Sequence, residues 1–370
     1  MTRTISVLAI TGLVLYAAAA ATAELPIQAM EDGADYLVGE QLSNGGWSWT
    51  QGGTAAENIT GPTGYGLVRY YEMSGGSTYL DAAKNAGNYI KDTVKYDNGE
   101  SRFGTFDPFY CLKLSAVASD STWTDHAATK FFDELTASTY GPANRDTAAF
   151  ISTVQAGRAG TWINLLPWEF STLAVTAASI GNTGQEALFK QAILDGLNTL
   201  DNTSPATVYS DLIGVAGGVR GLAMDGVTSF TAISSPKHAG INGIDSLEEL
   251  AAYLVSKQNA DGSWYWHSAL SSPGEDDKDT QTSAYAVLAL MAADVALGTS
   301  DYADEVSKAQ GWLVTMQKSD GGFYSWPGGT GLTNNEVTGE ATSALPEPAT
   351  MALLALGGIG MLARRIRRKA

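Results

Sequence analysis

The sequence is poor in the residues that build cross-links and metal centres. Its 370 residues include one cysteine, Cys111, and three histidines. A disulfide within the chain is therefore excluded, and so is a cysteine-rich zinc site. A multi-histidine centre would need most of the three histidines, which come from distant segments. The chain also has no phosphate-binding loop, nucleophile elbow or dinucleotide fingerprint.

Basic residues are scarce as well. The chain has 22 Lys and Arg against 39 Asp and Glu, a formal net charge of −17. Without the two chain ends discussed next, 16 basic and 38 acidic residues remain between Glu24 and Ala344, which gives −22. Such a surface repels nucleic acid and anionic lipid, so neither is expected as a partner.

The N-terminal segment has the pattern of a signal peptide. Arg3 precedes an apolar run from Ile5 to about Ala21, and 21-ATA-23 fits a small-x-small cleavage site. Cleavage there would make Glu24 the first mature residue. A membrane anchor or a buried helix is the alternative interpretation.

The C-terminal segment reads 345-LPEPATMALLALGGIGMLARRIRRKA-370. Pro346, Glu347 and Pro348 come first, then an apolar run of about 15 residues, then a basic cluster. The run is short for a membrane span, and the basic cluster would hold that end in the cytoplasm. The segment resembles the PEP-CTERM sorting signal of Gram-negative bacteria, and a plain tail anchor is the alternative.

This resemblance implies a cellular location and a partner enzyme. Proteins with the signal are exported, and an exosortase-type enzyme removes the tail. We therefore expect an exported protein of the cell envelope or medium, which touches the inner membrane only through its C-terminal segment before processing. The expected organisation is a signal peptide at 1–23, one domain at 24–344 and the sorting signal at 345–370.

A short motif recurs three times, as 41-QLSNGGW-47, 258-QNADGSW-264 and 317-QKSDGGF-323. Each copy ends an amphipathic helical stretch, and a more apolar one follows after a loop. The stretch 279–297 is apolar almost all round, which indicates full burial, and Asp279 is placed to cap it. Further amphipathic stretches are predicted at 79–95, 122–137 and 185–200, and apolar ones at 107–118, 169–180, 206–224 and 335–344.

Six hairpins, each an outer amphipathic helix followed by an inner buried one, predict an all-α fold, an (α/α)₆ toroid. The motif resembles the QW motif of the terpenoid cyclase and protein prenyltransferase superfamily, whose members are α/α toroids. The resemblance is clear over 245–340, fair over 29–75 and weak in between. Glycine permits the turn, and Trp47, Trp264 and Phe323 are expected to pack between hairpins. A ligand-stacking role for the tryptophans is the alternative.

Two chemistries that the resemblance implies fit the residues poorly. The order in 275-EDDKDT-280 is D-D-x-D rather than the D-x-D-D of class II terpene cyclases, and a cyclase is expected to need two toroid domains. A prenyltransferase zinc site would need Asp107, Cys111 and a distant histidine, but the family's spacing is closer. Cys111 is more simply a buried hydrophobe. No resident cofactor or metal is therefore expected.

Polysaccharide lyases and glycoside hydrolases, several of which are also α/α toroids or barrels, fit an exported protein better. Sugar rings stack on aromatic faces, so Trp49, Trp168 and Trp266 are candidate ligand-binding residues. Candidate acid–base groups are Glu169, Asp211, His267, Asp276 and Asp277. None forms a recognisable motif.

The loop 274-GEDDKD-279 is the most specific candidate site. Asp276 and Asp277 are expected to face the central cleft, with Trp266 and His267 along one wall. Their mutual repulsion would be relieved by solvent or by a cation such as calcium.

Two functions remain open. The first is a surface or extracellular-matrix component that binds polysaccharide without enzyme activity. The alternative is an extracellular polysaccharide lyase or glycoside hydrolase that uses the central cleft.

Overall fold

The computed structural model describes residues 26–93, 105–132, 147–271, 273–330 and 333–345. Within these ranges the chain is helical, and its only β-type pairings are isolated bridges between loops, such as Gln317 with Phe323. The predicted sorting residues Pro346, Glu347 and Pro348, and the predicted signal peptide, lie outside the described residues.

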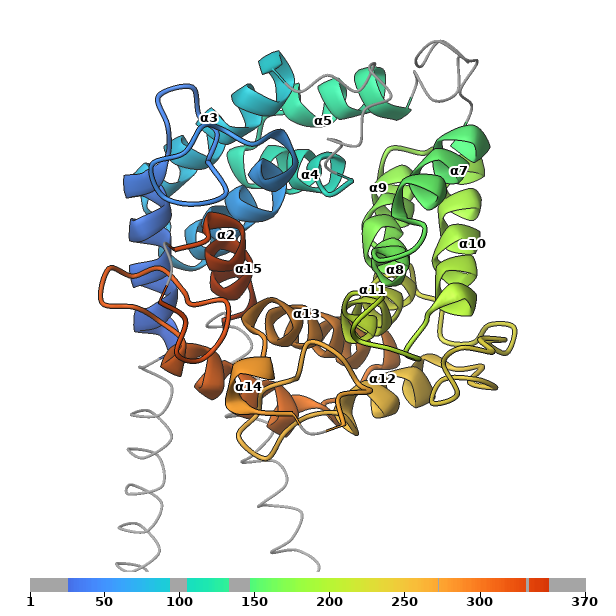
Figure 1. The fold of residues 1–370 in the computed structure, drawn as a ribbon. Helices are drawn as coiled ribbons and strands as arrows, with labels where there is room; N and C mark the ends of the chain where they lie inside the picture. The colour runs from blue at the N-terminus through green and yellow to red at the C-terminus, as the bar shows by residue number, and fades with distance from the viewer. Residues whose placement is uncertain (1–25, 94–104, 133–146, 272, 331–332, 346–370) are drawn as a thin grey trace, which may run out of the picture.

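The helices form two concentric layers (Figure 1). The outer helices are residues 26–40, α3 (Ser77–Thr93), α5 (Thr122–Ala127), α10 (Thr183–Thr199), α12 (Leu247–Val255) and α14 (Ala303–Thr315). The inner helices are α2 (Thr60–Ser74), α4 (Asp107–Ala118), α8 (Leu166–Phe170) with α9 (Leu173–Ser179), α11 (Asp211–Met224), α13 (Thr280–Leu297) and α15 (Asn335–Ala344). Shorter or additional elements are η1 (Glu57–Ile59), the short π-helix η2 (Ala128–Phe132), α7 (Thr147–Arg158), η3 (Ile163–Leu165) and η4 (Glu275–Asp277).

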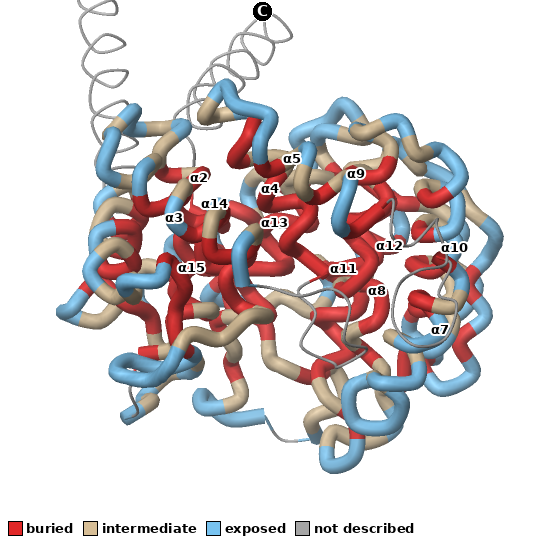
Figure 2. Tube along the Cα trace, turned by 90° about the horizontal axis from the view of Figure 1, so that it is seen from above, coloured by how far each residue is buried: buried red, intermediate tan, exposed pale blue. Residues whose placement is uncertain are grey.

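The inner helices make a closed ring. Each packs against the next along the chain, and the last, α15, packs against the first, α2. Figure 2 shows buried residues concentrated in these helices and exposed residues on the outer layer and the loops. Six outer and six inner positions are filled within the described residues, so the predicted α/α toroid is confirmed.

The helix α13 shows why the inner layer is so apolar. It packs between α11 and α15, with α12 and α14 outside, so little of it meets water. As predicted, Asp279 caps it, with its carboxylate accepting a 2.6 Å hydrogen bond from the Thr282 amide. Among the described helices α13 alone is long and apolar enough to cross a membrane, and its place in the ring accounts for that composition.

The third hairpin differs from the prediction. The stretch 169–180, expected as one inner helix, is divided into α8 and α9 at Ser171 and Thr172. The Ser171 hydroxyl donates to the Trp168 carbonyl at 2.8 Å, which satisfies the end of α8. The hydrophobic periodicity does not predict α7 (Thr147–Arg158), in which only Thr147, Phe150 and Ile151 are buried.

Glycines let α11 approach α8 at backbone distance. A Cβ on Gly217 would lie 2.3 Å from the Trp168 amide nitrogen, and one on Gly221 would lie 2.9 Å from the Ser171 Cα. Both positions therefore require glycine. This close approach carries Trp168 toward the middle of the ring.

The three repeated turns join neighbouring outer helices by the same bonds. In each, the glutamine amide donates to a carbonyl of its own turn and to one in the next outer helix. The second acceptors are Ala82, Glu305 and Ala29, at 2.8, 2.8 and 2.7 Å. The bond from Gln317 to Ala29 links the last turn to the first helix and closes the outer layer.

The aromatic residues of the repeat are part of the core. Trp47, Trp264 and Phe323 are fully buried. The indole nitrogens of Trp47 and Trp264 donate to Leu37 and Leu254 carbonyls, both at 2.8 Å. These side chains therefore serve architecture, as the sequence predicts.

The turn glycines sit at a contact that admits no side chain. Gly262 has φ +98°, and a Cβ there would lie 2.3 Å from the Lys308 carbonyl oxygen of α14. Gly298 is also left-handed, with φ +65°, but a Cβ there would meet nothing within 4 Å. Alanine at Gly298 would therefore meet backbone strain alone, whereas alanine at Gly262 would meet backbone strain and a steric conflict with α14.

We predict different costs for alanine at these two glycines. Gly298→Ala should lower the unfolding free energy by about 1 kcal/mol, from left-handed strain alone. Gly262→Ala should lower it by about 3 kcal/mol or more, because α14 must also move away. Denaturant unfolding of both variants measures the difference, and equal losses would contradict the proposed contact.

Candidate functional site

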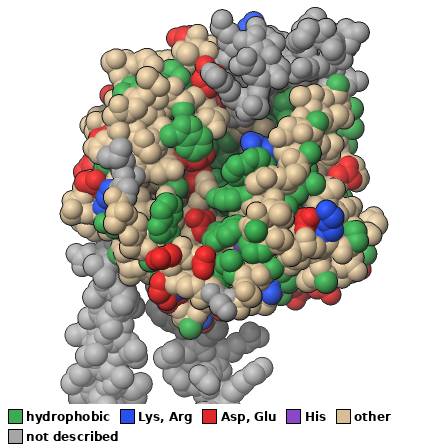
Figure 3. All heavy atoms as spheres, in the orientation of Figure 1, with side chains coloured by type: hydrophobic (Ala, Val, Ile, Leu, Met, Phe, Trp, Pro, Cys, Tyr) green, Lys and Arg blue, Asp and Glu red, His purple; other side chains and the backbone are tan. Residues whose placement is uncertain are grey.

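The centre of the ring is open on one face. All hairpins run the same way round, so the inner helices begin on the face that Figures 1 and 3 present. Figure 3 shows a hollow there, with hydrophobic and acidic side chains along its walls. Contacts between inner helices that are not ring neighbours identify the residues at its centre.

Arg220 of α11 reaches across this centre. Its guanidinium carbon lies 5.2 Å from the Phe106 ring, 5.5 Å from the Phe109 ring and 4.9 Å from the Trp168 ring. The side chain is buried, and its Nη1 has no hydrogen-bond partner among the described residues. Burial lowers the pKa of the Arg220 guanidinium from its ordinary value.

Aromatic and carboxyl groups surround this cation. Trp168 stacks on Tyr285 of α13 with ring centres 3.5 Å apart and planes 17° from parallel. The Tyr285 hydroxyl donates to one carboxyl oxygen of Glu340, and the Gln281 amide donates to the other at 2.9 Å. Glu340 is therefore held by two donors while only 2% of its surface is exposed.

Glu336 and Glu340 lie one turn apart on α15, so both point to the same side of that helix. Glu336 is half-buried at the wall of the hollow. Burial, and then the nearby Glu169 charge, raise the pKa of Glu336 to about 8, although Arg158 opposes the shift. Burial, and then the charge of Glu336, raise the pKa of Glu340 well above its ordinary value.

Glu169 faces Glu336 from the other side of the ring. It is buried, accepts a 2.6 Å hydrogen bond from the Thr105 hydroxyl and forms an ion pair with Arg158. Its charge contributes to the raised pKa of Glu336. The hollow therefore combines a carboxyl group of raised pKa with a carboxylate that is paired with Arg158.

Of the predicted residues, Trp168 and Glu169 lie in this central cluster. Trp266 lines the same face, where its ring stacks on Tyr209 at 6.1 Å and 24°. The hydroxyl of Tyr209 lies near enough to Glu336 for that charge to raise its pKa, after burial and Asp279. Trp49 is 43% exposed on the loop before α2, and its carbonyl accepts the Asn335 amide at 3.0 Å.

The predicted acidic loop forms the short helix η4 before α13. Asp276 is exposed, and Asp277 is half-buried. Asp277 accepts hydrogen bonds from the Trp266 indole at 3.3 Å and from the Gly274 amide at 2.8 Å. Among the described residues no three Asp, Glu, His or Cys side chains converge on a metal position, so calcium at this loop gains no support.

His267 and Asp211 belong to a separate buried network. Asp211 accepts from the Ser268 amide at 2.8 Å and pairs with His238 at 2.9 Å, and its Oδ1 lies 3.6 Å from His267. Burial opposes ionisation of Asp211, but the bonds from His238 and Ser268 and the nearby His267 hold its pKa below the ordinary value. This network ties two loops to the start of α11.

Sequence reasoning missed Arg220, Tyr285, Glu336 and Glu340. The hydrophobic periodicity assigns Arg220, Glu336 and Glu340 to inner helices, where burial of a charge costs free energy. That conflict was the available signal, since a charge in an otherwise apolar inner stretch must face either a partner or the centre.

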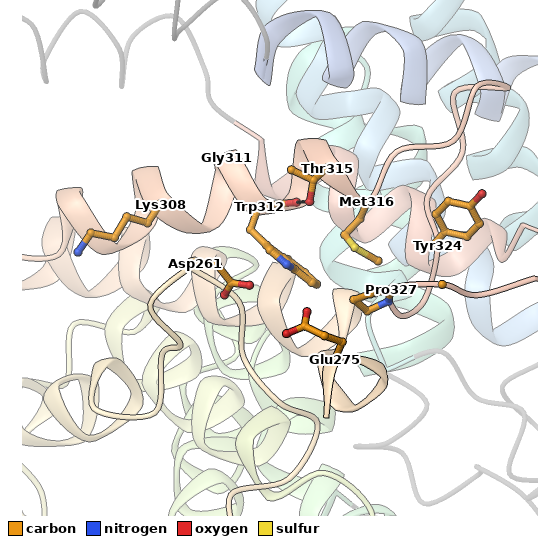
Figure 4. Close-up of a pocket in the computed structure, with 10 residues that line it drawn as sticks. Asp261, Glu275, Lys308, Gly311, Trp312, Thr315, Met316, Tyr324 and Pro327 are labelled. Atoms are coloured by element: carbon orange, nitrogen blue, oxygen red, sulfur yellow. Dashed lines mark hydrogen bonds between the residues drawn. The ribbon is translucent and has the colours of Figure 1, made fainter. Parts of the chain in front are cut away.

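A second hollow, about 600 Å³, lies outside the ring between α14 and the repeated turns (Figure 4). Trp312, Met316, Tyr324 and Pro327 supply its apolar surface. Its carboxylates Asp261 and Glu275 are both paired with Lys278, at 2.7 and 2.6 Å. Because Lys278 already pairs with both carboxylates, the outer hollow is a weaker candidate for chemistry than the central cluster.

Comparison with known proteins bears on the C-terminus and the fold. Residues 344–369 match the PEP-CTERM protein-sorting motif. The chain is therefore exported, held transiently in the membrane and sorted by an exosortase-type enzyme. No curated protein is similar enough in sequence to match the chain.

Three solved structures share the toroid at low identity. An unsaturated glucuronyl hydrolase specific for heparin is 12% identical with TM-score 0.57, and the match covers 90% of this chain and 98% of the hydrolase. A polysaccharide lyase is 14% identical with TM-score 0.55, and the match covers 91% of this chain and 98% of the lyase. A type II terpene cyclase from Scytonema is 14% identical with TM-score 0.53, covering 89% and 99%.

These likenesses establish the fold and correct one expectation. The terpene cyclase is matched over nearly its whole chain by this protein's one ring. The expectation that a cyclase needs two toroid domains is therefore wrong. At 12–14% identity the comparisons say nothing of this chain's own chemistry.

We predict an abnormal pH dependence of stability from Glu336. Folded Glu336 keeps its proton to about pH 8, whereas an unfolded glutamate loses it near about pH 4.3. The native state binds more protons between these values, so stability falls as pH rises through this window. Glu336→Gln has no such proton and should be more stable than wild type at pH 8 by about 1 kcal/mol or more, with the difference gone near pH 4.

Denaturant titrations across this pH range measure the effect, with Glu248→Gln on exposed α12 as the control. The control should keep the wild-type slope. A Glu336→Gln protein with an unchanged slope would show that this carboxyl ionises normally.

We also predict where sorting divides the chain. If Pro346, Glu347 and Pro348 form the recognition element, the mature protein from its native host lacks residues 349–370. Intact-mass spectrometry tests this, and an extracellular form that retains Arg367 or Lys369 would contradict it.

Proposed function

We propose that this protein is an exported enzyme that binds a polysaccharide in the central hollow and hydrolyses a glycosidic bond there. The observation that carries the proposal is Glu336, a carboxyl group whose pKa of about 8 keeps it protonated at neutral pH. A general acid works best with a pKa near the working pH. Glycoside hydrolysis needs such an acid beside an ionised carboxylate.

The surroundings of Glu336 suit a sugar. Trp168 and Trp266 are half-buried aromatic side chains. Trp168 stacks on Tyr285, whose hydroxyl donates to Glu340, and the Trp266 indole donates to Asp277, so polar groups adjoin both rings. Ligand sites usually combine aromatic walls with a few placed polar groups. A hydrocarbon substrate, as in terpene cyclisation, would instead face the guanidinium of Arg220 and the ion pair of Glu169 with Arg158.

The proposed reaction uses two carboxyl groups. Glu336 gives its proton to the glycosidic oxygen, and the bond from C1 to that oxygen breaks with its electron pair leaving on the oxygen. A water oxygen then bonds to C1, and the water proton passes to the carboxylate of Glu169. Exchange with solvent returns both groups to their starting states. Glu340, bound by Tyr285 and Gln281, positions the α15 side of the site.

The cost of the cluster supports a functional role. Burying carboxyl groups and an arginine in a helical ring is unfavourable, and apolar side chains of similar size would serve stability as well. Strongly shifted carboxyl groups are concentrated in active sites for this reason. Solved toroids of similar fold include a glucuronyl hydrolase and a polysaccharide lyase.

The second candidate is a surface or extracellular-matrix component that binds polysaccharide without cleaving it. Glu169 favours it, because its ion pair with Arg158 and its bond from Thr105 already occupy the carboxylate that would have to accept the water proton. With either function, the protein would lie in the cell envelope of a Gram-negative bacterium or be secreted around the cell.

We predict that the mature protein releases new reducing ends from at least one of six polysaccharides: xylan, glucomannan, alginate, pectate, hyaluronan and chondroitin sulfate. Glu336→Gln should lower the rate at least about 100-fold, as the loss of a general acid does, while retention on that polysaccharide persists. The wild-type rate should fall as pH rises through about 8. Unsaturated ends would indicate a lyase, and retention without products would support the second candidate.

A further inference from the structure

Three aromatic rings follow one another on the open face, with Tyr209 in the middle. The Trp162 ring centre lies 5.0 Å from that of Tyr209, and Tyr209 lies 6.1 Å from Trp266. Trp162 is 45% exposed, and the other two are half-buried. We call these three residues the aromatic strip.

Trp162 is the exposed end of the strip, on the loop that leads into η3 and α8. Tyr209 is the middle ring, and the charges of Asp279, Glu336 and Glu340 contribute, after burial, to the raised pKa of its hydroxyl. Trp266 is the other end, where its indole donates to Asp277 of the acidic loop. A ligand on the strip would therefore extend from the loop of Trp162 past Tyr209 to the acidic loop.

The rings are held in place by the backbone around them. The Tyr209 amide donates to the Thr161 carbonyl at 2.6 Å, and the Asn164 side chain donates to the Tyr209 carbonyl at 2.7 Å. The Trp266 indole donates to Asp277 at 3.3 Å. Prearranged rings lose little conformational entropy when a ligand binds.

We propose that the aromatic strip binds consecutive sugar units of one polysaccharide chain, so that the protein takes an internal stretch of a polymer rather than a single terminal sugar. This inference rests on the proposed function. The three rings offer apolar surface at ring spacings of 5.0 and 6.1 Å, and a row of this length serves a chain longer than the two sugars at the broken bond. An exposed tryptophan beside two more rings is otherwise an unused apolar surface.

Affinity electrophoresis through gels that contain each of the six polysaccharides tests the strip. All proteins carry Glu336→Gln, so that no chain is cut. Trp162→Ala should weaken retardation roughly tenfold in apparent Kd, the loss of about 1.4 kcal/mol. Trp326→Ala is the matched control, because Trp326 is 50% exposed on another loop of the open face and should keep full retardation.

Chain length gives a second readout. Oligosaccharides of two to six units from the retarding polysaccharide should bind Glu336→Gln more tightly as they lengthen, and Trp162→Ala should remove that gain. Trp162→Leu, with thermal unfolding measured alongside, replaces the alanine variant if that variant does not fold.

The outcomes separate the two proposals. If no polysaccharide retards the protein, both the proposed function and the strip are wrong. If retardation occurs but Trp162→Ala leaves it unchanged, or Trp326→Ala weakens it equally, only the strip is overturned.

Discussion

Closure of the helical ring is the constraint on which the rest of the structure depends. A hairpin of one outer and one inner helix cannot bury its own apolar faces, so each needs neighbours on both sides. The bond from the Gln317 side chain to the Ala29 carbonyl, and the packing of α15 on α2, give the first and last hairpins those neighbours. Without closure, α2 and α15 would each expose an apolar face to water.

Closure also creates the centre. Six inner helices around a ring leave a middle that none of them fills alone, and side chains from opposite helices meet there. Arg220 of α11 reaches Phe109 of α4, and Glu336 of α15 interacts with Glu169 of α8. Burial is the main cause of the shifted pKa values of Glu336 and Arg220, which gives the centre of the ring groups suited to acid–base chemistry.

The sequence predicts whatever depends on local pattern. The motif around Trp264, the cap at Asp279 and the apolar inner stretches each follow from neighbouring residues, and the structure has them where they are expected. The division of α8 from α9 depends instead on α11, whose glycines are distant in sequence. Local periodicity carries no information about such a contact.

The residues of the candidate site were also predictable only in part. Trp168 and Glu169 could be named from their aromatic-rich loop, and the structure brings both to the centre. Glu336 and Glu340 were missed, because the conflict between their charges and their inner stretch shows that they need partners but not which partners. Those partners, Tyr285 and Gln281 for Glu340 and the charge of Glu169 for Glu336, come from other helices that only the closed ring brings near.

The central claim is that Glu336 is a protonated acid at neutral pH. Carbon-13 NMR of the glutamate side-chain carboxyl groups, recorded from acid to alkaline pH, measures this directly, with Glu336→Gln used to assign the signal. The account predicts one carboxyl resonance that is absent from the variant and titrates near pH 8 in the wild type. A Glu336 resonance that titrates near about 4.3, as an ordinary glutamate does, would contradict it.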